Sequence, residues 1–261
     1  MRLVAYNMGR GGSRDPALLA RLLAGLEPDL LFVQESRDPE RSWLPALPAN
    51  TAADPDKESW LLTAVPSGHW GTGLWVRSGH LTPLEVPEDF TGRVVAAVVE
   101  GLAWPGTCVQ PVIALSIHAP TRKGSSYIKE VGRILDFAAT LADAQPLVLA
   151  GDFNVVVGSR QPGQIPSVSQ GENTLLKRLQ EEFDLVPCWQ TAHPGEPLAR
   201  TLRWMRRMDS LPYHCDGLFM PSAWVHALES CTVLEDQEWC ALSDHNPVVA
   251  TLAWPPSYSQ S

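Results

Sequence analysis

The chain has 261 residues, of which 44% are hydrophobic and 19% charged. This length suits one large sheet-rich domain over residues 1–261, and the composition excludes a disordered, collagen-like or coiled-coil protein. The 29 acidic residues outnumber the 20 Lys and Arg residues and give a net charge of −9. A protein that coats nucleic acid is normally basic, so any binding to nucleic acid would depend on a local basic patch.

Targeting and membrane signals are not visible in the sequence. Residues 1–6 form a strand-like run without the apolar region of a signal peptide, and no stretch reaches the ~18 apolar residues of a membrane span. The five cysteines are scattered and form no C-x-x-C pair, which argues against a disulfide framework or a zinc site. We therefore expect a monomeric cytoplasmic protein with no membrane partner.

The first half of the chain predicts two buried strands, one helix and a series of short strands. Apolar runs at 3–7 and 29–34 are typical of buried strands, and leucines at helical spacing between them predict a helix from Leu18, with Asp15 as its N-cap. The Pro-rich segment 36–57 is expected to be a loop. The next part of the chain predicts an antiparallel meander with strands at 60–65, 72–77, 81–86, 93–99 and 108–117.

Helices and strands alternate in the second half. Ser125 or Ser126 caps a predicted helix whose apolar face ends at Leu141, and 147–150 is typical of a buried strand. Asn173 is the expected cap of a helix that continues to Phe183. Further strands are expected near 185–190, 213–219, 228–234 and 247–253. Two groups of strands with helices between and outside them predict an α/β fold with two packed sheets.

Polar side chains follow the ends of several predicted strands, where they can converge at one rim of a sandwich. The set comprises Asn7, Glu35, His118, Asp152, Asn154, Asp216, Asp244 and His245. Carboxylates gathered in one place are costly to desolvate, and a bound divalent cation offsets that cost. Oxygen ligands without thiolates favour Mg²⁺ or Mn²⁺ over Zn²⁺.

Each of these residues also has a purely structural interpretation. Asn7 before a glycine turn is often a turn former, and His118 could be a buried core histidine. Residues 152–154 could form an Asx-type turn, and Ser243 with Asp244 could cap a helix. Coincidence explains any one of these features, but it is a poor explanation for several short words in one order along the chain.

Six such words carry a resemblance to a known family: Tyr6-Asn7, Val33-Gln34-Glu35, Ser116-Ile-His118, Gly151-Asp-Phe-Asn154, Cys215-Asp216-Gly-Leu-Phe219 and Ser243-Asp-His-Asn-Pro247. The chain resembles the endonuclease/exonuclease/phosphatase superfamily of magnesium-dependent phosphoesterases, which includes deoxyribonucleases and abasic-site endonucleases. The resemblance covers nearly the whole chain. It implies a four-layered α/β/β/α sandwich of two mainly antiparallel sheets flanked by helices.

The resemblance also implies a role for each matching position. Glu35 would bind the metal, with Asn7 and Asp244 beside it. Asp152 would orient or deprotonate the attacking water, and Asn154 would hold an oxygen of the scissile phosphate. These roles describe in-line attack of water on phosphorus.

Two histidines would complete the site. Asp216 would fix and charge His245, which stabilises the phosphorane-like transition state, and His118 would contact the same phosphate. Two positions depart from the family pattern. Abasic endonucleases usually carry an Asp where this chain has Gly9, which makes a second metal less expected, and the glutamate that pairs with the first histidine in deoxyribonucleases has no counterpart in 66–78.

Two basic stretches contain candidate residues for substrate binding. Arg203, Trp204 and Arg206 belong to an arginine-rich stretch that could hold phosphate oxygens and stack a base on the indole. Arg122, four residues after His118, could meet a phosphate on the far side of the substrate. Both stretches could equally be solvated surface charge.

We therefore expect a Mg²⁺- or Mn²⁺-dependent phosphodiesterase that hydrolyses P–O bonds, acting as a nuclease on DNA or RNA through a water activated by Asp152. The alternative is a small phosphoester substrate, such as a nucleotide or an inositol phosphate, which the acidic composition favours. A catalytically silent binding module is the third hypothesis, and the presence of every core residue argues against it. The sequence leaves open the choice of DNA or RNA, cleavage inside a strand or from an end, and one metal or two.

Overall fold

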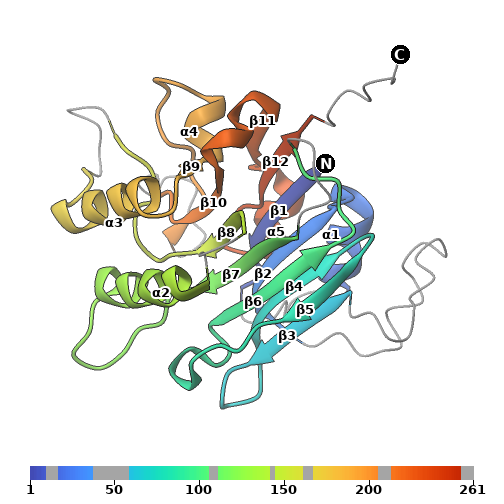
Figure 1. Ribbon diagram of the computed structural model, residues 1–261, viewed down its shortest axis with the longest axis horizontal. Coiled ribbons are helices and arrows are strands. Elements are labelled where there is room, and N and C mark those ends of the chain that lie inside the picture. Colours follow the sequence, from blue (N-terminus) through green and yellow to red (C-terminus); the bar gives the residue numbers. More distant parts are fainter. Residues whose placement is uncertain are drawn as a thin grey trace.

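Two six-stranded sheets pack face to face in the computed structural model (Figure 1), which describes residues 1–9, 17–37, 59–105, 111–141, 145–160, 167–204 and 213–253. The first sheet has the order β11-β12-β1-β2-β4-β3, with β1 (Arg2–Asn7), β2 (Leu30–Ser36), β3 (Trp60–Ala64), β4 (Gly71–Val76), β11 (Leu228–Val233) and β12 (Val248–Leu252). The second has the order β5-β6-β7-β8-β10-β9, with β5 (His80–Pro83), β6 (Val94–Glu100), β7 (Val112–His118), β8 (Leu147–Asp152), β9 (Leu185–Pro187) and β10 (Asp216–Pro221).

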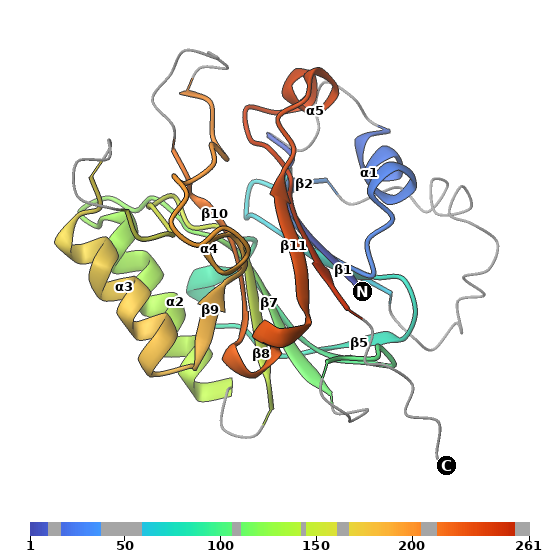
Figure 2. The same cartoon turned by 90° about the horizontal axis from the view of Figure 1, so that it is seen from above.

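Helices cover the outer faces of both sheets, as the view in Figure 2 shows. α1 (Leu18–Leu26) and α5 (Gln237–Leu242) lie on the side of the first sheet, and α2 (Tyr127–Leu141) and α3 (Gln170–Glu181) lie on the side of the second. The short α4 (Cys188–Ala192) follows β9. The four-layered α/β/β/α sandwich expected from the sequence is confirmed.

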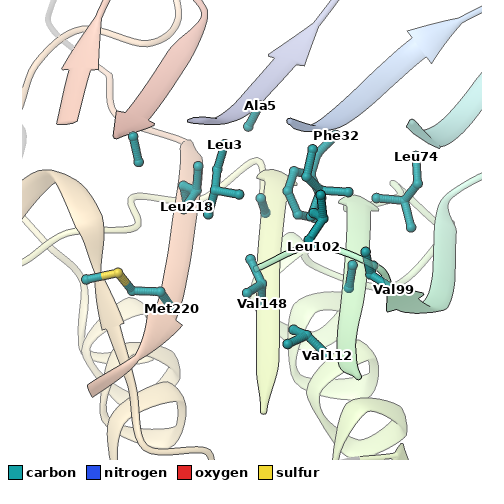
Figure 3. Close-up of a cluster of buried hydrophobic side chains, with 14 of the residues drawn as sticks. Leu3, Ala5, Phe32, Leu74, Val99, Leu102, Val112, Val148, Leu218 and Met220 are labelled. Atoms are coloured by element: carbon teal, nitrogen blue, oxygen red, sulfur yellow. The ribbon is translucent and has the colours of Figure 1, made fainter. Parts of the chain in front are cut away.

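The main hydrophobic core fills the space between the two sheets (Figure 3). Leu3, Phe32 and Leu74 of the first sheet face Val148 and Leu218 of the second. Two further clusters bury the inner faces of the helices against the sheets. Strands β1, β2, β7 and β8 are therefore covered on both faces, which explains their nearly continuous apolar sequences.

Two parallel strand pairs direct their carboxyl ends to one rim of the sandwich. β1 pairs with β2 so that Asn7 lies opposite Gln34, and β7 pairs with β8 so that His118 lies opposite Asp152. The sheets also contact each other there, since Gln34 Nε2 donates a hydrogen bond to Ser116 Oγ at 3.0 Å. The polar residues at these strand ends consequently gather at one place.

Several expected elements differ from the structure. The strands of the segment from Trp60 to His118 are divided between the sheets, because β3 and β4 pair in the first and β5, β6 and β7 pair in the second. A single meander was therefore the wrong expectation. α3 is capped by Ser169, which forms a capping box with Glu172, and not by Asn173.

The short helices α4 and α5 occupy regions where no helix was expected. The expected cap Asp15 lies outside the described residues, as does the first part of the strand expected at 108–117. Among the described residues, no helix has both the length and the apolar character needed to traverse a bilayer.

Candidate active site

Asp152, at the end of β8, is the centre of the polar rim. Its side chain is buried, and both carboxylate oxygens accept hydrogen bonds: Oδ2 from Asn7 Nδ2 at 2.9 Å and Oδ1 from the Asn154 backbone N–H at 2.8 Å. The preceding Gly151 has a φ of 134°, and a Cβ there would lie 2.1 Å from the Ile117 carbonyl oxygen. Only glycine fits at this position, so the Gly-Asp word reflects the close approach of β7.

His245 and Asp216 form a buried pair next to Asp152. His245 Nδ1 lies 2.8 Å from Asp216 Oδ2 and 3.1 Å from Oδ1, and a carboxylate can only accept, so Nδ1 donates. Thr201 Oγ1 accepts the Asp216 backbone N–H at 3.0 Å and thereby anchors the start of β10. The other imidazole nitrogen, His245 Nε2, lies 3.8 Å from Asp152 Oδ2.

His118, at the end of β7, faces the same carboxylate with its Nε2. This nitrogen is 3.8 Å from Asp152 Oδ2 and 3.8 Å from Glu35 Oε1. The Nδ1 atom lies 3.2 Å from Arg93 Nη1, and the Arg93 guanidinium stacks on the Trp70 ring at 4.4 Å. Neither Arg93 nor Trp70 was among the residues predicted to form the site.

The two imidazoles have opposite electrostatic surroundings. Burial disfavours the charged form of His245, but the carboxylates of Asp216 and Asp152 outweigh this and raise the pKa of His245 to about 10. Burial lowers the pKa of His118 to about 4, and the Arg93 charge acts in the same direction against the attraction of Asp152. Burial and the charge of Asp216 raise the pKa of Asp152.

The segment that carries His245 is held by an arginine that we had expected to contact substrate. Arg203 is 1% exposed, its guanidinium donates to Asn246 Oδ1 and to the Ser243 and Cys240 carbonyl oxygens, and its backbone N–H donates to the Asp244 carbonyl oxygen at 2.8 Å. A buried guanidinium with these acceptors is not available to a phosphate. The expectation for Arg203 is therefore wrong, because two isolated β-bridges of the neighbouring Leu202 draw this part of the stretch into the fold.

Glu35, Asp244 and Asn7 are the residues that could hold a divalent cation. Glu35 has a φ of 52°, in the left-handed region, at an irregularity of the β2–β4 pairing, and its side chain is 21% exposed. The Asn7 amide nitrogen is engaged by Asp152, and its Oδ1 accepts the Gly9 N–H at 3.0 Å. This set of oxygen donors fits Mg²⁺ or Mn²⁺, both of which prefer carboxylate and carbonyl ligands.

Gly9 lies directly against Asp244. A Cβ at this glycine would be 2.9 Å from Ser243 Oγ and 3.4 Å from Asp244 Oδ1, and its φ of 64° also favours glycine. A side chain at this position would therefore press on the Ser243 hydroxyl. The expectation that this position supplies no ligand for a second metal stays a prediction.

A buried cluster of Asp152, Cys215, Asp216 and His245 also has ligand atoms within 4.8 Å of one another. Two of its members already bond to each other, because His245 donates to Asp216. Burial raises the pKa of the Cys215 thiol well above its usual value, so the thiolate that a soft metal needs is disfavoured. The composition of the cluster thus favours a hydrogen-bonded pair over a metal site.

Trp204 and Tyr213 form an aromatic pair beside the rim. Trp204 is 55% exposed, the two ring centroids are 5.8 Å apart, and the Tyr213 hydroxyl donates to the Asn154 carbonyl oxygen at 3.4 Å. Arg206 lies outside the described residues. The pair therefore presents an exposed indole close to the residue expected to bind the phosphate.

Arg122 belongs to an ion-pair network on the other side of the rim. Its Nη1 lies 3.1 Å from Asp89 Oδ2 and its Nε lies 3.2 Å from the buried Glu130. Its side chain remains 30% exposed. A role of Arg122 in substrate binding stays a prediction, and the network shows that this arginine also joins the segment after β7 to α2.

Comparisons with known proteins agree on the family. A family profile described as "Endonuclease/Exonuclease/phosphatase family" matches residues 4–214. Similar solved structures include an AP endonuclease from Archaeoglobus fulgidus, with a TM-score of 0.68, 15% identity and coverage of 97% of this chain and 99% of that one. The AP endonuclease LMAP from Leishmania major has a TM-score of 0.67 and 15% identity, with coverage of 97% and 88%.

A third similar structure is the 3′ phosphatase NExo from Neisseria bound to product DNA hairpin, with a TM-score of 0.65, 20% identity and coverage of 97% and 100%. No curated protein matches the sequence. At these identities the structural likeness shows the fold alone, whereas the profile covers most of the chain. The protein belongs to the endonuclease/exonuclease/phosphatase family and is a phosphoester hydrolase.

Proposed function

We propose that the protein is a Mg²⁺- or Mn²⁺-dependent phosphodiesterase that cleaves nucleic acid. The observation that carries this proposal is the convergence of two imidazoles on one buried carboxylate, since His118 Nε2 and His245 Nε2 each lie 3.8 Å from Asp152 Oδ2. A phosphate placed there would meet a base, a cation and a hydrogen-bond donor at once. These are the groups that an in-line displacement at phosphorus requires.

Asp152 is the proposed general base. Hydrogen bonds from Asn7 Nδ2 and the Asn154 N–H fix both of its oxygens, so the carboxylate has one orientation. Its raised pKa, caused by burial and the charge of Asp216, improves its ability to take a proton from water near neutral pH. Water held by Asp152 would attack phosphorus from the side opposite the leaving oxygen.

His245 is the proposed charged stabiliser of the transition state. Its Nδ1–H is held by Asp216, which leaves Nε2–H directed toward the site as a charge-assisted donor. Negative charge develops on the phosphate oxygens as the new bond forms, and a preoriented cation in a buried site stabilises it strongly. Asn154 Nδ2 donates to the Ala119 carbonyl oxygen at 3.1 Å, which fixes the orientation of the amide.

Glu35 and Asp244, with Asn7 beside them, are the proposed holders of the divalent cation. When bound, such a cation supplies charge neutralisation and Lewis acidity at a phosphate oxygen. The −9 net charge of the chain makes this local compensation important for an anionic substrate.

The exposed aromatic pair favours nucleic acid as the substrate. Trp204 offers an open indole face, and Tyr213 connects it to Asn154. Stacking of a base on an aromatic ring contributes about 1–3 kcal/mol without depending on its identity. AP endonucleases and a DNA-bound 3′ phosphatase among the similar structures support the same substrate class.

A small phosphoester is the second candidate, and the acidic composition is the observation that favours it. A nucleotide or inositol phosphate needs only a local cationic pocket, whereas a duplex meets the field of the whole protein. Trp204→Ala separates the two candidates. The substitution should weaken binding of an oligonucleotide about tenfold and leave turnover of a small diester unchanged.

A substrate panel tests the proposed function. It contains supercoiled plasmid, single-stranded and abasic oligonucleotides, bis(p-nitrophenyl) phosphate and inositol phosphates, each with Mg²⁺, Mn²⁺ or EDTA. We expect metal-dependent cleavage of the diesters, and we expect Asp152→Asn to reduce it by about 10³-fold. Asp136→Asn, on the exposed face of α2, is the matched control and should retain full activity.

Two results would contradict the proposal: activity that persists in EDTA, or activity that Asp152→Asn leaves intact. Hydrolysis of inositol phosphates without any cleavage of oligonucleotides would select the second candidate. The single domain over residues 1–261, the monomeric state and the cytoplasmic location stay predictions.

A further inference from the structure

Arg93 and Trp70 form a cluster with His118, and neither of the two has a role in the proposed reaction. The register of β6 and β7 makes Arg93 the cross-strand neighbour of His118, because the His118 backbone N–H donates to the Arg93 carbonyl oxygen at 2.8 Å. Their side chains also meet, with Arg93 Nη1 at 3.2 Å from His118 Nδ1. Trp70 completes the cluster, since its ring lies 4.4 Å from the guanidinium carbon and 5.3 Å from the imidazole centroid.

The chemistry of this contact defines the hydrogen-bonding state of His118. A guanidinium has only N–H donors, so the nitrogen that meets it must be an acceptor. His118 Nδ1 therefore carries the lone pair and Nε2 carries the proton. The Nε2–H is directed toward Glu35 and Asp152 at 3.8 Å from each carboxylate, beyond direct hydrogen-bond length.

The stacked indole restricts the guanidinium to this arrangement. Arg93 is half-buried, and its guanidinium lies over the Trp70 ring, where the attraction between cation and ring holds it. The imidazole is 6% exposed and has little room to rotate away. The backbone pairing of Arg93 with His118, the contact with Trp70 and the burial of the imidazole thus all stabilise the hydrogen bond between Arg93 Nη1 and His118 Nδ1.

We propose that Arg93 is a positioning residue that fixes the tautomer of His118, so that His118 acts as an uncharged Nε2–H donor to an oxygen of the scissile phosphate. His245 has the opposite arrangement, because a carboxylate accepts from its Nδ1. The site would then contain one charged imidazole and one neutral imidazole on either side of Asp152. The part of this inference that concerns turnover rests on the proposed function.

Nuclear magnetic resonance of ¹⁵N-histidine-labelled protein tests the tautomer without any substrate. In the wild-type protein at neutral pH we expect His118 to show an unprotonated Nδ1 and a protonated Nε2. Arg93→Met removes the donors and keeps an unbranched side chain against Trp70, so the signals should move toward a mixture of tautomers. A protonated His118 Nδ1 in the wild-type protein would overturn the inference, even if no phosphoester were ever found to be hydrolysed.

Kinetics with bis(p-nitrophenyl) phosphate and Mg²⁺ test whether Arg93 acts through His118. We expect Arg93→Met to lower kcat about tenfold with KM changed by less than about twofold, and Arg93→Lys to recover part of the loss. In a His118→Gln background, Arg93→Met should have almost no further effect. A full additional loss in that background would mean that Arg93 contacts substrate itself, and the positioning role would be wrong.

Arg77→Met is the matched control for these variants. Arg77 follows β4 at the opposite end of the sheet, where its Nε donates to the Pro28 carbonyl oxygen and lies 3.6 Å from Asp29. Arg77→Met removes the same guanidinium charge as Arg93→Met, but at a site far from His118. Wild-type kcat and an unchanged His118 tautomer in Arg77→Met would tie the effects to Arg93, whereas equal changes in both variants would contradict a specific contact.

Discussion

The two sides of the rim use the same residue type in opposite ways. On the side of β12, a buried carboxylate accepts from His245 Nδ1, and the pKa of His245 rises to about 10. On the side of β7, a guanidinium meets His118 Nδ1, and burial together with that charge lowers the pKa of His118 to about 4. Both rings present Nε2 to Asp152 at 3.8 Å.

The partner of Nδ1 therefore determines the charge of each imidazole and the kind of hydrogen bond that its Nε2 can donate. In the proposed mechanism, the histidine next to a carboxylate would supply a positive charge to the phosphorane-like transition state. The histidine next to an arginine would supply a hydrogen bond without a charge. A neutral His118 also leaves Asp152 next to one imidazolium instead of two. A second positive charge would lower the pKa of Asp152 and make it a weaker base.

Removal of the charged imidazole should have the largest effect on catalysis. His245→Gln keeps a donor of similar size but loses the cation, and we expect kcat for a diester to fall about 10³-fold. Asp216→Asn should cost about 10²-fold, because it removes the group that holds and charges the ring. His226→Gln, an exposed histidine in the segment Ser222–Ala227, is the control. A larger fall in kcat in His118→Gln than in His245→Gln would contradict the assignment of the positive charge to His245.

Loss of the buried arginine should mainly affect stability. Arg203→Met leaves the Ser243 and Cys240 carbonyl oxygens and Asn246 Oδ1 without their donor, and we expect the free energy of unfolding to fall by about 3 kcal/mol. Denaturant titration measures this effect. Arg178→Met, which breaks an ion pair of α3 with Asp136 of α2 and another with Glu182, should change this free energy by less than about 1 kcal/mol. Equal losses in both variants would show that Arg203 is no more than a surface ion-pair residue.

Removal of the neutral imidazole should have a smaller kinetic effect. His118→Gln takes away one uncharged hydrogen bond to the phosphate, and a loss of about tenfold in kcat is expected. Steady-state kinetics with bis(p-nitrophenyl) phosphate give the value. A loss near 10³-fold would indicate that His118 works as a cation, and the distinction between the two sides would disappear.

The two histidines should also act on stability in opposite pH ranges in metal-free protein. The pKa of His245 is raised in the folded state from 6.5 to about 10, so its contribution is fully present below pH 6.5 and is lost as pH rises toward 10. The pKa of His118 is lowered from 6.5 to about 4, so stability is lost as pH falls through this interval. Denaturant unfolding in EDTA at several pH values should show the free energy of unfolding falling on both sides of neutral pH, as an acidic limb and an alkaline limb. Each histidine should contribute a slope below about 1.4 kcal/mol per pH unit.

His245→Gln should flatten only the alkaline limb, and His118→Gln only the acidic one. The pKa of Asp152 is raised from 3.8, so its contribution to stability is lost as pH rises above about 3.8 and partly offsets the gain from His118 in the acidic range. An alkaline limb that His245→Gln leaves unchanged would contradict the raised pKa of this ring.

The sequence identified Asp152, Asp216, His245 and His118, which the structure brings together, but it gave no indication of Arg93. The short motifs around Asp152, Asp216 and His245 contain unusual local features. One is Gly151, which is required because the backbone of β7 passes too close for any side chain. Arg93 has no such signal, because one arginine at the start of an expected strand looks like ordinary surface charge. Its role depends on the register between β6 and β7, and spacing along one strand does not reveal register.

The same limit explains the error at Arg203. Arginines in a polar stretch are normally exposed, and burial of this one depends on the bridges of Leu202 with Tyr213 and His245. The helices α4 and α5 have only 5 and 6 residues, which is too short to show a helical period. Longer elements with a buried face, such as α2 and β1, were predicted with bounds close to those observed.

Hydrolysis of bis(p-nitrophenyl) phosphate in H₂¹⁸O with Mg²⁺ tests the central claim most directly. Attack at phosphorus by water held at Asp152 predicts one ¹⁸O atom in the released p-nitrophenyl phosphate and none in p-nitrophenol, in the wild-type protein and at a rate about 10³-fold lower in Asp152→Asn. Label in the p-nitrophenol, or a rate that is the same in both proteins, would contradict the account.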